Sequence, residues 1–110
     1  MEKVSIIVPV YNAAEYVGKC LESVALQDYK NIEIIVVEDG SDDESPDVCK
    51  EYARRYDNIK VYHDKCGTAG AARNYGMSKA QGEYFIFVDS DCMFPPQWLA
   101  EIEKAQNEHY

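Results

Sequence analysis

Residues 4 to 12 read Val4-Ser-Ile-Ile-Val-Pro-Val-Tyr-Asn12, and this stretch decides the class of fold. Its first seven residues are almost continuously apolar and rich in Val and Ile, which is typical of a strand buried on both faces of a sheet. The run ends abruptly at Tyr11 and Asn12, where a helical pattern begins. A continuous apolar strand followed by a helix is the repeating unit of proteins with a parallel sheet.

The same unit recurs along the chain. Further apolar runs of strand type lie at Ile32 to Val37, Ile59 to His63 and Tyr84 to Val88, and we expect the second and fourth runs to be buried like the first. Segments of helical spacing separate and follow them. The order βαβαβαβα predicts an α/β fold, a Rossmann-like parallel sheet of four βα units with helices on both faces. Ligands bind such sheets beyond the carboxyl ends of the strands.

Local signals set the expected helix ends. Asn12-Ala-Ala-Glu15 has the pattern of a capping box, and Ser45 before Pro46 has that of an N-cap. The third helix is expected from about Ala69 to Ala80 with Gly82 as its C-terminal cap, and Pro95-Pro96 opens the fourth. The apolar stripe of the first helix is expected to comprise Tyr16, Val17, Cys20, Leu21 and Val24.

The amino-acid composition limits the classes of partner that the chain can bind. The 110 residues include 20 Asp and Glu against 11 Lys and Arg, a formal net charge of -9, with 46% hydrophobic residues. Duplex nucleic acid and anionic membranes require a basic surface, so the charge argues against both as partners. No run approaches the roughly 18 apolar residues of a membrane span.

The cysteines and the N-terminal residues bear on the compartment. The four cysteines form no CxxC pair, so we interpret them as reduced thiols rather than a disulfide framework or zinc site. The first apolar run is too short for a signal peptide. We expect a cytoplasmic protein, or one at the cytoplasmic face of a membrane.

The segments after the first two strands hold candidate ligand contacts. Tyr11 stands at the expected sheet edge, where it could stack on a planar base or could simply pack beside a helix cap. Glu38 and Asp39 directly follow the second strand, and a carboxylate there can accept hydrogen bonds from a base or a ribose. The nearby acids Asp42, Asp43 and Asp47 are explained by a helix N-terminus, which favours negative charge.

The segments after the last two strands point to phosphate and metal. Arg73 lies in the first turns of a helix at the ligand edge, where it can pair with phosphate or form a salt bridge to the acidic loop. Asp89-Ser90-Asp91 places two carboxylates one residue apart at a strand end. Such a pair suits Mg²⁺ or Mn²⁺ shared with a diphosphate, although an ordinary acidic turn has the same residues.

Four segments together resemble family 2 of the glycosyltransferases, which have the GT-A fold. The matching segments are residues 4–12, Ile35-Val-Val-Glu-Asp-Gly-Ser41 with Asp43, Ala71-Ala-Arg-Asn74, and Gly82-Glu-Tyr-Phe-Ile-Phe-Val-Asp-Ser-Asp91. They occur in the family's order over residues 4 to about 105. Four motifs in the right order are far more specific than any one of them.

The resemblance implies metal-dependent, inverting transfer of a sugar from a nucleoside diphosphate sugar, commonly a UDP-sugar, to a glycan or lipid-linked acceptor. It also implies roles for nine residues. The nucleotide-binding residues would be Pro9, Val10, Tyr11, Glu38, Asp39, Arg73, Asp89 and Ser90, with Asp39 on the base, and the metal ligands would be Asp91 and Asp89.

This sequence departs from the family pattern in a few places. Cys92 replaces a frequent further Asp, while Cys66 and Thr68 stand where the family often has Asn and Gly. The chain is also about half the length of the family's domain. We therefore expect residues 1–110 to be the donor-binding half, with the catalytic base and acceptor site beyond it.

Two other functions fit the residues less well. A phosphatase would use Asp89 as nucleophile and Asp91 as acid, but that motif normally follows the first strand of its fold. A non-catalytic nucleotide-binding module would expose apolar surface and self-associate into a homo-oligomer, and Tyr75, Phe94 and Trp98 are its candidate contacts.

Overall fold

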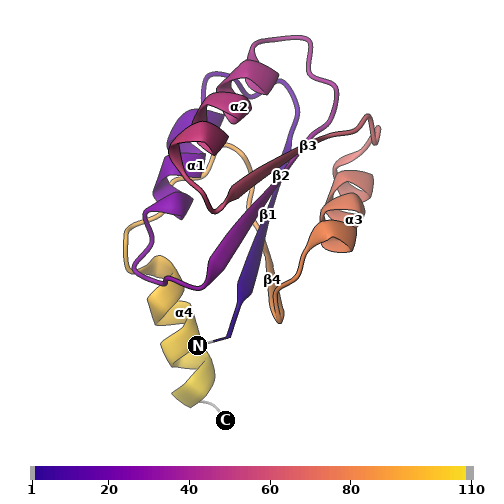
Figure 1. The fold of residues 1–110 in the computed structure, drawn as a ribbon. Coiled ribbons are helices and arrows are strands. Elements are labelled where there is room, and N and C mark those ends of the chain that lie inside the picture. The colour runs from indigo at the N-terminus through magenta and orange to yellow at the C-terminus, as the bar shows by residue number, and fades with distance from the viewer. Residues whose placement is uncertain (1, 109–110) are drawn as a thin grey trace.

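The computed structural model describes residues 2–108 and confirms the α/β class (Figure 1). Four strands and four helices alternate along the chain. They are β1 (Val4–Val10), α1 (Val17–Ala25), β2 (Ile32–Glu38), α2 (Ser45–Arg55), β3 (Ile59–His63), α3 (Ala69–Lys79), β4 (Tyr84–Phe87) and α4 (Trp98–Glu108). The four strands form one parallel sheet in the order β3-β2-β1-β4.

β1 lies inside the sheet and pairs on both sides. Its register places Val4 opposite Ile32 of β2 and opposite Tyr84 of β4. This position explains the continuous apolar run of β1. Successive side chains of the strand point to opposite faces of the sheet, and helices cover both faces. β2 is buried along its whole length for the same reason.

β4 corrects the expectation that the fourth run is buried on both faces. Within the described residues β4 pairs with β1 alone, so it is an edge strand. Phe85 and Phe87 expose 44% and 46% of their surface. A strand with a neighbour on one side only is covered less completely than a central strand, although its residues are just as apolar.

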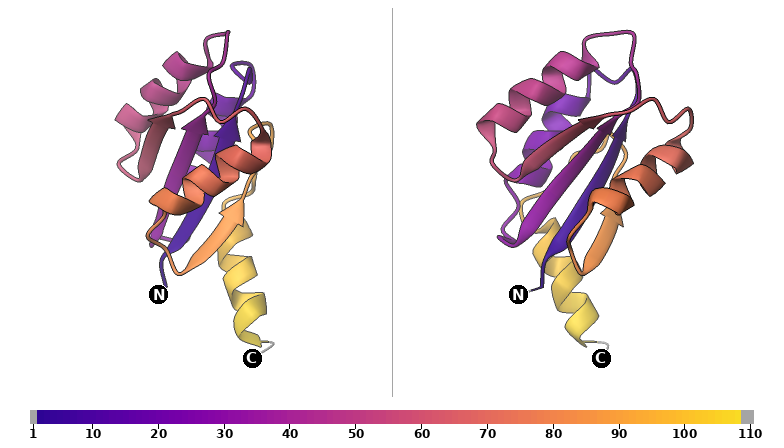
Figure 2. Two further views of the ribbon diagram at one scale, coloured as in Figure 1. Left: turned by 90° about the vertical axis from the view of Figure 1, so that its right-hand side faces the viewer. Right: turned by 45° about the vertical axis from the view of Figure 1, so that its right-hand side comes forward.

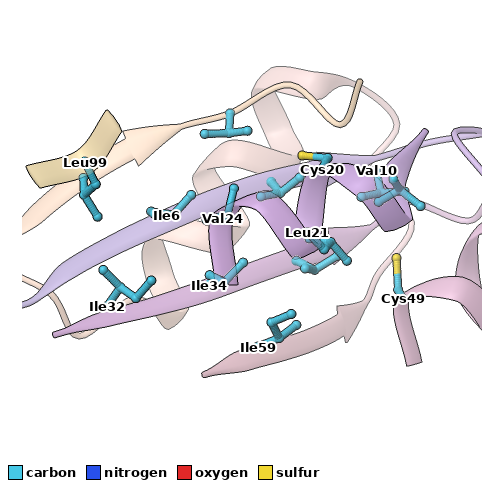
Figure 3. Packing of buried hydrophobic residues seen from close by; sticks show 14 of the residues in the cluster. Ile6, Val10, Cys20, Leu21, Val24, Ile32, Ile34, Cys49, Ile59 and Leu99 are labelled. Carbon is cyan, nitrogen blue, oxygen red and sulfur yellow. The ribbon is translucent and has the colours of Figure 1, made fainter. Parts of the chain in front are cut away.

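Helices cover both faces, as the alternation predicted. α1 and α2 lie side by side on one face, and α3 lies alone on the other (Figures 1 and 2). Figure 3 shows the larger core between the sheet and α1, which also receives Cys49 from α2 and Leu99 from α4. Among the described residues, no helix combines the length and apolar character needed to cross a membrane.

The first helix begins later than expected, and its capping box is wrong. Asn12 has a φ of 50°, and its side chain accepts a hydrogen bond from Asp42 N at 2.8 Å rather than capping a helix. The helix starts at Val17, and Tyr16, placed on the apolar stripe, is 52% exposed. The other four members of that stripe are buried.

Two further cap assignments change because tertiary contacts compete for the same groups. Ser45 is the first residue of α2, and its hydroxyl accepts a hydrogen bond from Ala13 N at 2.8 Å instead of capping. Gly82 does not cap α3, which ends at Lys79. A Cβ on Gly82 would lie 2.4 Å from Ser5 Oγ, so this glycine permits close approach to β1. The fourth helix starts at Trp98, after Pro95-Pro96.

A buried carboxylate that the sequence analysis did not single out ties the amino ends of the strands together. Glu33 is 2% exposed and accepts a hydrogen bond from Ser5 Oγ at 2.6 Å and another from the Gln81 amide. The ammonium groups of Lys60 and Lys3 lie 3.5 and 3.9 Å from its other oxygen. Burial by itself raises the pKa of Glu33, but these hydrogen bonds and charges bring the net pKa below its usual 4.5.

We expect Gly76→Ala to lower the free energy of unfolding by about 1–3 kcal/mol, the usual cost of overpacking a core. A Cβ at Gly76 would lie 2.6 Å from Ile7 Cγ2, where α3 packs on the sheet. Gly70→Ala, in the same helix but with nothing within 4 Å of the added Cβ, is the matched control. It should leave stability unchanged or raised, because Ala favours helix. Urea unfolding followed by circular dichroism measures both, and equal effects would contradict the packing argument.

We expect Glu33→Gln to destabilise the fold by about 1–3 kcal/mol at neutral pH, since it removes charge-assisted hydrogen bonds. The folded pKa lies below the unfolded one, so the stabilisation is complete above about pH 4.5 and is lost as pH falls through the folded pKa. The variant should therefore lose less stability on acidification than the parent. Urea unfolding over a pH series measures this.

Glu51→Gln provides the control for that experiment. Glu51 forms ion pairs with Arg54 and Arg55 on the exposed surface of α2, so its loss should cost no more than about 1 kcal/mol. A Glu33→Gln variant that unfolds with acid as steeply as the parent would refute the buried-carboxylate account.

Candidate functional site

A cavity of about 660 Å³ opens at the carboxyl ends of β1 and β4 and is bounded by the start of α3. This volume is in the range of small-molecule sites. The strand order reverses here, since β2 follows β1 on one side and β4 lies on the other. Of the nine residues proposed from sequence, eight line the cavity: Pro9, Val10, Tyr11, Asp39, Arg73, Asp89, Ser90 and Asp91.

The loop that carries Tyr11 is held by the acidic loop after β2. Asn12 N donates to Ser41 Oγ at 2.8 Å, and Asn12 Oδ1 accepts from Asp42 N at the same distance. Ala14 N donates to Asp43 Oδ2 at 3.2 Å. These bonds hold Asn12 in its left-handed conformation and leave Tyr11 57% exposed at the cavity.

Hydrogen bonds in the same acidic loop account for the role of Asp43. Its carboxylate accepts hydrogen bonds from Ser45, which together with the Ala14 amide lower the pKa of Asp43. Asp43 therefore serves the connection between two loops as well as the helix start that the sequence suggested.

Glu38 is the one proposed site residue that does not line the cavity. It is 2% exposed, and its carboxylate accepts hydrogen bonds from Gly40 N at 3.1 Å and from the amide and hydroxyl of Ser41. Gly40, with a φ of 71°, allows the tight turn that brings these donors back to Glu38. In this arrangement the carboxylate shapes its own loop.

Asp39 joins two loops at the cavity wall. Its Oδ1 accepts hydrogen bonds from the amides of Cys66 and Gly67, the latter at 3.1 Å, in the loop after β3. The residue is 8% exposed and lines the cavity. No hydrogen bond is assigned to its second oxygen, Oδ2, among the described residues.

Arg73 contacts the end of β4. Its guanidinium lies 3.7 Å from Asp89 Oδ1, so the ion pair joins α3 to the Asp89-Ser90-Asp91 motif and not to the acidic loop after β2. This pairing supplies a positive partner for the two neighbouring carboxylates, whose mutual repulsion requires one. Arg73 also lines the cavity, where its charge faces any anionic ligand.

The Asp89 to Cys92 turn gathers potential metal ligands. The Cys92 amide donates to the Asp89 carbonyl at 3.1 Å, which closes the turn. One ligand atom each from Asp89, Asp91 and Cys92 lies within 4.8 Å of the others. Both carboxylates are exposed, and carboxylate oxygens are the ligands that Mg²⁺ and Mn²⁺ prefer, so this donor set fits a divalent cation.

The four cysteines are free. Burial raises the pKa of Cys20 and Cys49 to about 12, so both thiols stay protonated and inert near neutral pH. The other two, Cys66 and Cys92, are partly exposed near the cavity.

The structure adds six lining residues to which the sequence analysis gave no ligand role, and three of them, Tyr16, Lys65 and Thr68, carry polar side-chain groups. Tyr16 was assigned to the core because its spacing fits the helical stripe. Thr68 caps α3 by accepting a hydrogen bond from Ala71 N at 3.0 Å. Lys65 lies in the loop between β3 and α3, and a lysine in a loop that follows the carboxyl end of a strand is the sequence signal for it.

Comparison with known proteins identifies the family. The family model described as glycosyl transferase family 2 matches residues 5–110. The glycosyltransferase GlyA of Streptococcus pneumoniae is 47% identical over 103 residues, which are 94% of this chain and 15% of GlyA. The chain spans 15 to 30% of the length of the first curated relatives it matches.

Solved structures agree with this match. TarS of Staphylococcus aureus, residues 1–349, solved with UDP-GlcNAc, aligns with a TM-score of 0.86 at 34% identity over 97% of this chain and 32% of that chain. The mannosyltransferase PcManGT of Pyrobaculum calidifontis, solved with GDP-Man and Mn²⁺, aligns with a TM-score of 0.87 at 27% identity over 94% of this chain and 32% of its own. Together with the family match over nearly the whole chain, these results show that the protein belongs to glycosyl transferase family 2.

Proposed function

We propose that residues 1–110 bind the donor of a glycosyltransferase, which transfers a sugar from a nucleoside diphosphate sugar to a glycan or lipid-linked acceptor. The observation that carries this proposal is the cavity at the switch point. It brings an exposed aromatic ring, a buried carboxylate, two cations and a carboxylate pair to one place, although they follow four different strands.

The nucleoside would occupy the side of the cavity formed by β1 and β2. Pro9 and Val10 form the edge of β1, and the exposed Tyr11 ring can stack on a base. Asp39 keeps one oxygen for the base while the other holds the loop after β3. Glu38, proposed from sequence as a further nucleotide contact, would support this side by shaping the loop beside Asp39.

The diphosphate would lie toward α3 and β4. Arg73 brings positive charge to that side, Lys65 adds a second cation to the lining, and the Ser90 hydroxyl lies between the two carboxylates in the sequence. Asp89 and Asp91 would hold Mg²⁺ or Mn²⁺, which when bound neutralises the departing nucleoside diphosphate. The Mn²⁺ and GDP-Man in the PcManGT structure support a metal and a nucleotide sugar, while UDP-GlcNAc in TarS supports a UDP-sugar.

The acceptor site and the catalytic base belong to the rest of such an enzyme in this proposal. The chain covers less than a third of TarS and PcManGT, and it supplies donor-side groups but no residue that we assign as the base of an inverting transfer. The compartment proposed is the cytoplasm, and the four free cysteines support a reducing environment.

We expect the chain to bind UDP in the presence of Mn²⁺ or Mg²⁺, with at least about tenfold weaker binding when the metal is chelated, since charge-assisted contacts contribute about 1.5–3 kcal/mol. Asp91→Asn should weaken the metal-dependent binding by a similar factor. Isothermal titration calorimetry with UDP, with and without Mn²⁺, measures both effects.

Asp57→Asn makes the same chemical change at an exposed turn outside the cavity, and it should bind UDP as the parent does. UDP binding that ignores metal, or an Asp91→Asn variant that binds like the control, would refute the proposed metal ligands. GDP run in parallel shows whether the site distinguishes the bases.

A second proposal, self-association of the 110-residue chain, rests on the exposed edge of the sheet. Tyr75, Phe94 and Trp98, the contacts expected from sequence, are each only partly exposed. Phe94 and Trp98 stack at 3.9 Å and pack against the core, and Tyr75 packs edge-on against Tyr62. Phe85 and Phe87 on β4 are more exposed, and we propose that a second copy of the chain covers them.

The chain should therefore form dimers as its concentration rises, and Phe85→Lys should weaken the dimer by placing a charge on the β4 face. Sedimentation velocity over a concentration series measures the association. Leu26→Lys is the control, because Leu26 is 56% exposed at the end of α1, away from β4. A parent chain that remains monomeric throughout would rule out this proposal.

A further inference from the structure

Cys92 stands beside the two carboxylates of the proposed metal site and has no role in the function described so far. Its sulfur, one Asp89 oxygen and one Asp91 oxygen form a group in which all three ligand atoms lie within 4.8 Å of one another. The Cys92 thiol lies 3.7 Å from Asp91 Oδ1, close enough for its proton to point at that carboxylate.

The backbone holds these three side chains together. The Asp89 carbonyl accepts the Cys92 amide at 3.1 Å, and the same carbonyl accepts the buried Cys20 thiol at 3.5 Å from below the turn. Just before the turn, Val88 is buried and its amide donates to Ile7 O at 3.0 Å, which anchors the segment to β1. The turn is therefore fixed from two sides, and the cluster does not depend on a long flexible side chain.

The three ligand atoms are unequal in their exposure. The carboxylates of Asp89 and Asp91 are exposed, whereas Cys92 is partly buried against the core beneath the sheet end. Because the three ligand atoms lie within 4.8 Å of one another, a single ion can contact both carboxylates and the sulfur.

We propose that Cys92 Sγ is a third protein ligand of this metal site, and that it gives the site a preference for thiophilic divalent ions such as Zn²⁺, Co²⁺ and Cd²⁺ over Mg²⁺. The inference rests on the metal site of the proposed function. On binding, a sulfur–metal bond forms and the thiol proton passes to the solvent.

The chemistry of the ligands gives the direction of this preference. Carboxylate and water ligands suit Mg²⁺ and Mn²⁺, whereas thiolate is a soft ligand that selects softer ions. An Asp or Ser at position 92 would offer only oxygen, so the sulfur is the feature that separates this chain's site from an all-oxygen one.

Co²⁺ titration of the full 110-residue chain tests for the sulfur bond directly, since a thiolate bound to Co²⁺ gives a charge-transfer band in the near ultraviolet. The parent and a Cys66→Ser variant should show the band, and Cys92→Ser should lack it while still binding Co²⁺ through its carboxylates. Cys66 is the matched control because it is also partly exposed near the cavity but lies outside the cluster.

Competition between Cd²⁺ and Mg²⁺ gives a second readout. Cys92→Ser should lower the ratio of the Cd²⁺ affinity to the Mg²⁺ affinity by more than about tenfold, because loss of even an outer-shell contact costs 10–100-fold. Circular dichroism shows whether the variants fold. If Cys92→Ser does not fold, the Co²⁺ absorption spectra of the parent chain and of Cys66→Ser still decide whether a sulfur binds the metal.

The outcomes separate this inference from the proposed function. Co²⁺ bound by the parent without a charge-transfer band, or a band and an affinity ratio that survive in Cys92→Ser, would overturn the role of Cys92 and leave the carboxylate site standing. A parent chain that binds none of these ions, with or without UDP, would remove both the metal site and the sulfur ligand.

Discussion

The parallel pairing of β1 on both of its edges is the constraint on which the rest of the structure depends. β1 lies between β2 and β4, buried on both faces, and helices must therefore cover the sheet on two sides. The chain leaves the carboxyl end of β1 toward one face, and the end of β4 lies beside it on the reversed side of the strand order. The helices that follow these two strands, α1 and α4, both pack into the larger core, α3 covers the other face, and the cavity lies at the carboxyl ends of β1 and β4 beside the start of α3.

The acidic residues around this opening have separate physical roles. Glu38 accepts backbone hydrogen bonds within the loop after β2, Asp43 joins that loop to the one after β1, and Asp39 adds the loop after β3. Asp89 and Asp91 remain exposed, with Arg73 as the cation beside them. An acidic domain can therefore present a site for an anionic ligand, because Glu38, Asp39 and Asp43 are engaged in holding loops and Arg73 offsets the charge of Asp89.

Much of the fold and of the site could be predicted from local pattern. The apolar runs located all four strands, and β1 begins and ends at the residues expected. Eight of nine candidate residues line one cavity because parallel strands bring their carboxyl ends to the same edge. The predictions failed where a side chain bonds a group that is distant in the sequence instead of its own helix or strand. Asn12 bonds the acidic loop instead of its own helix, and Glu33, on a strand that reads as apolar, is stabilised by partners 28 and 48 residues away.

The sequence by itself determined the order of strands and helices, the membership of the family and the identity of the groups at the strand ends, because periodicity and short motifs are properties of neighbouring residues. Only the tertiary structure decided which of those groups face the cavity. In the folded chain the Glu38 side chain points back to the loop that follows it, and Arg73 pairs with Asp89. The aromatic face of β4 is exposed, and the Cys92 sulfur lies beside two carboxylates. The direction of a side chain at a strand end depends on hydrogen-bond donors from other loops, and no local pattern records those donors.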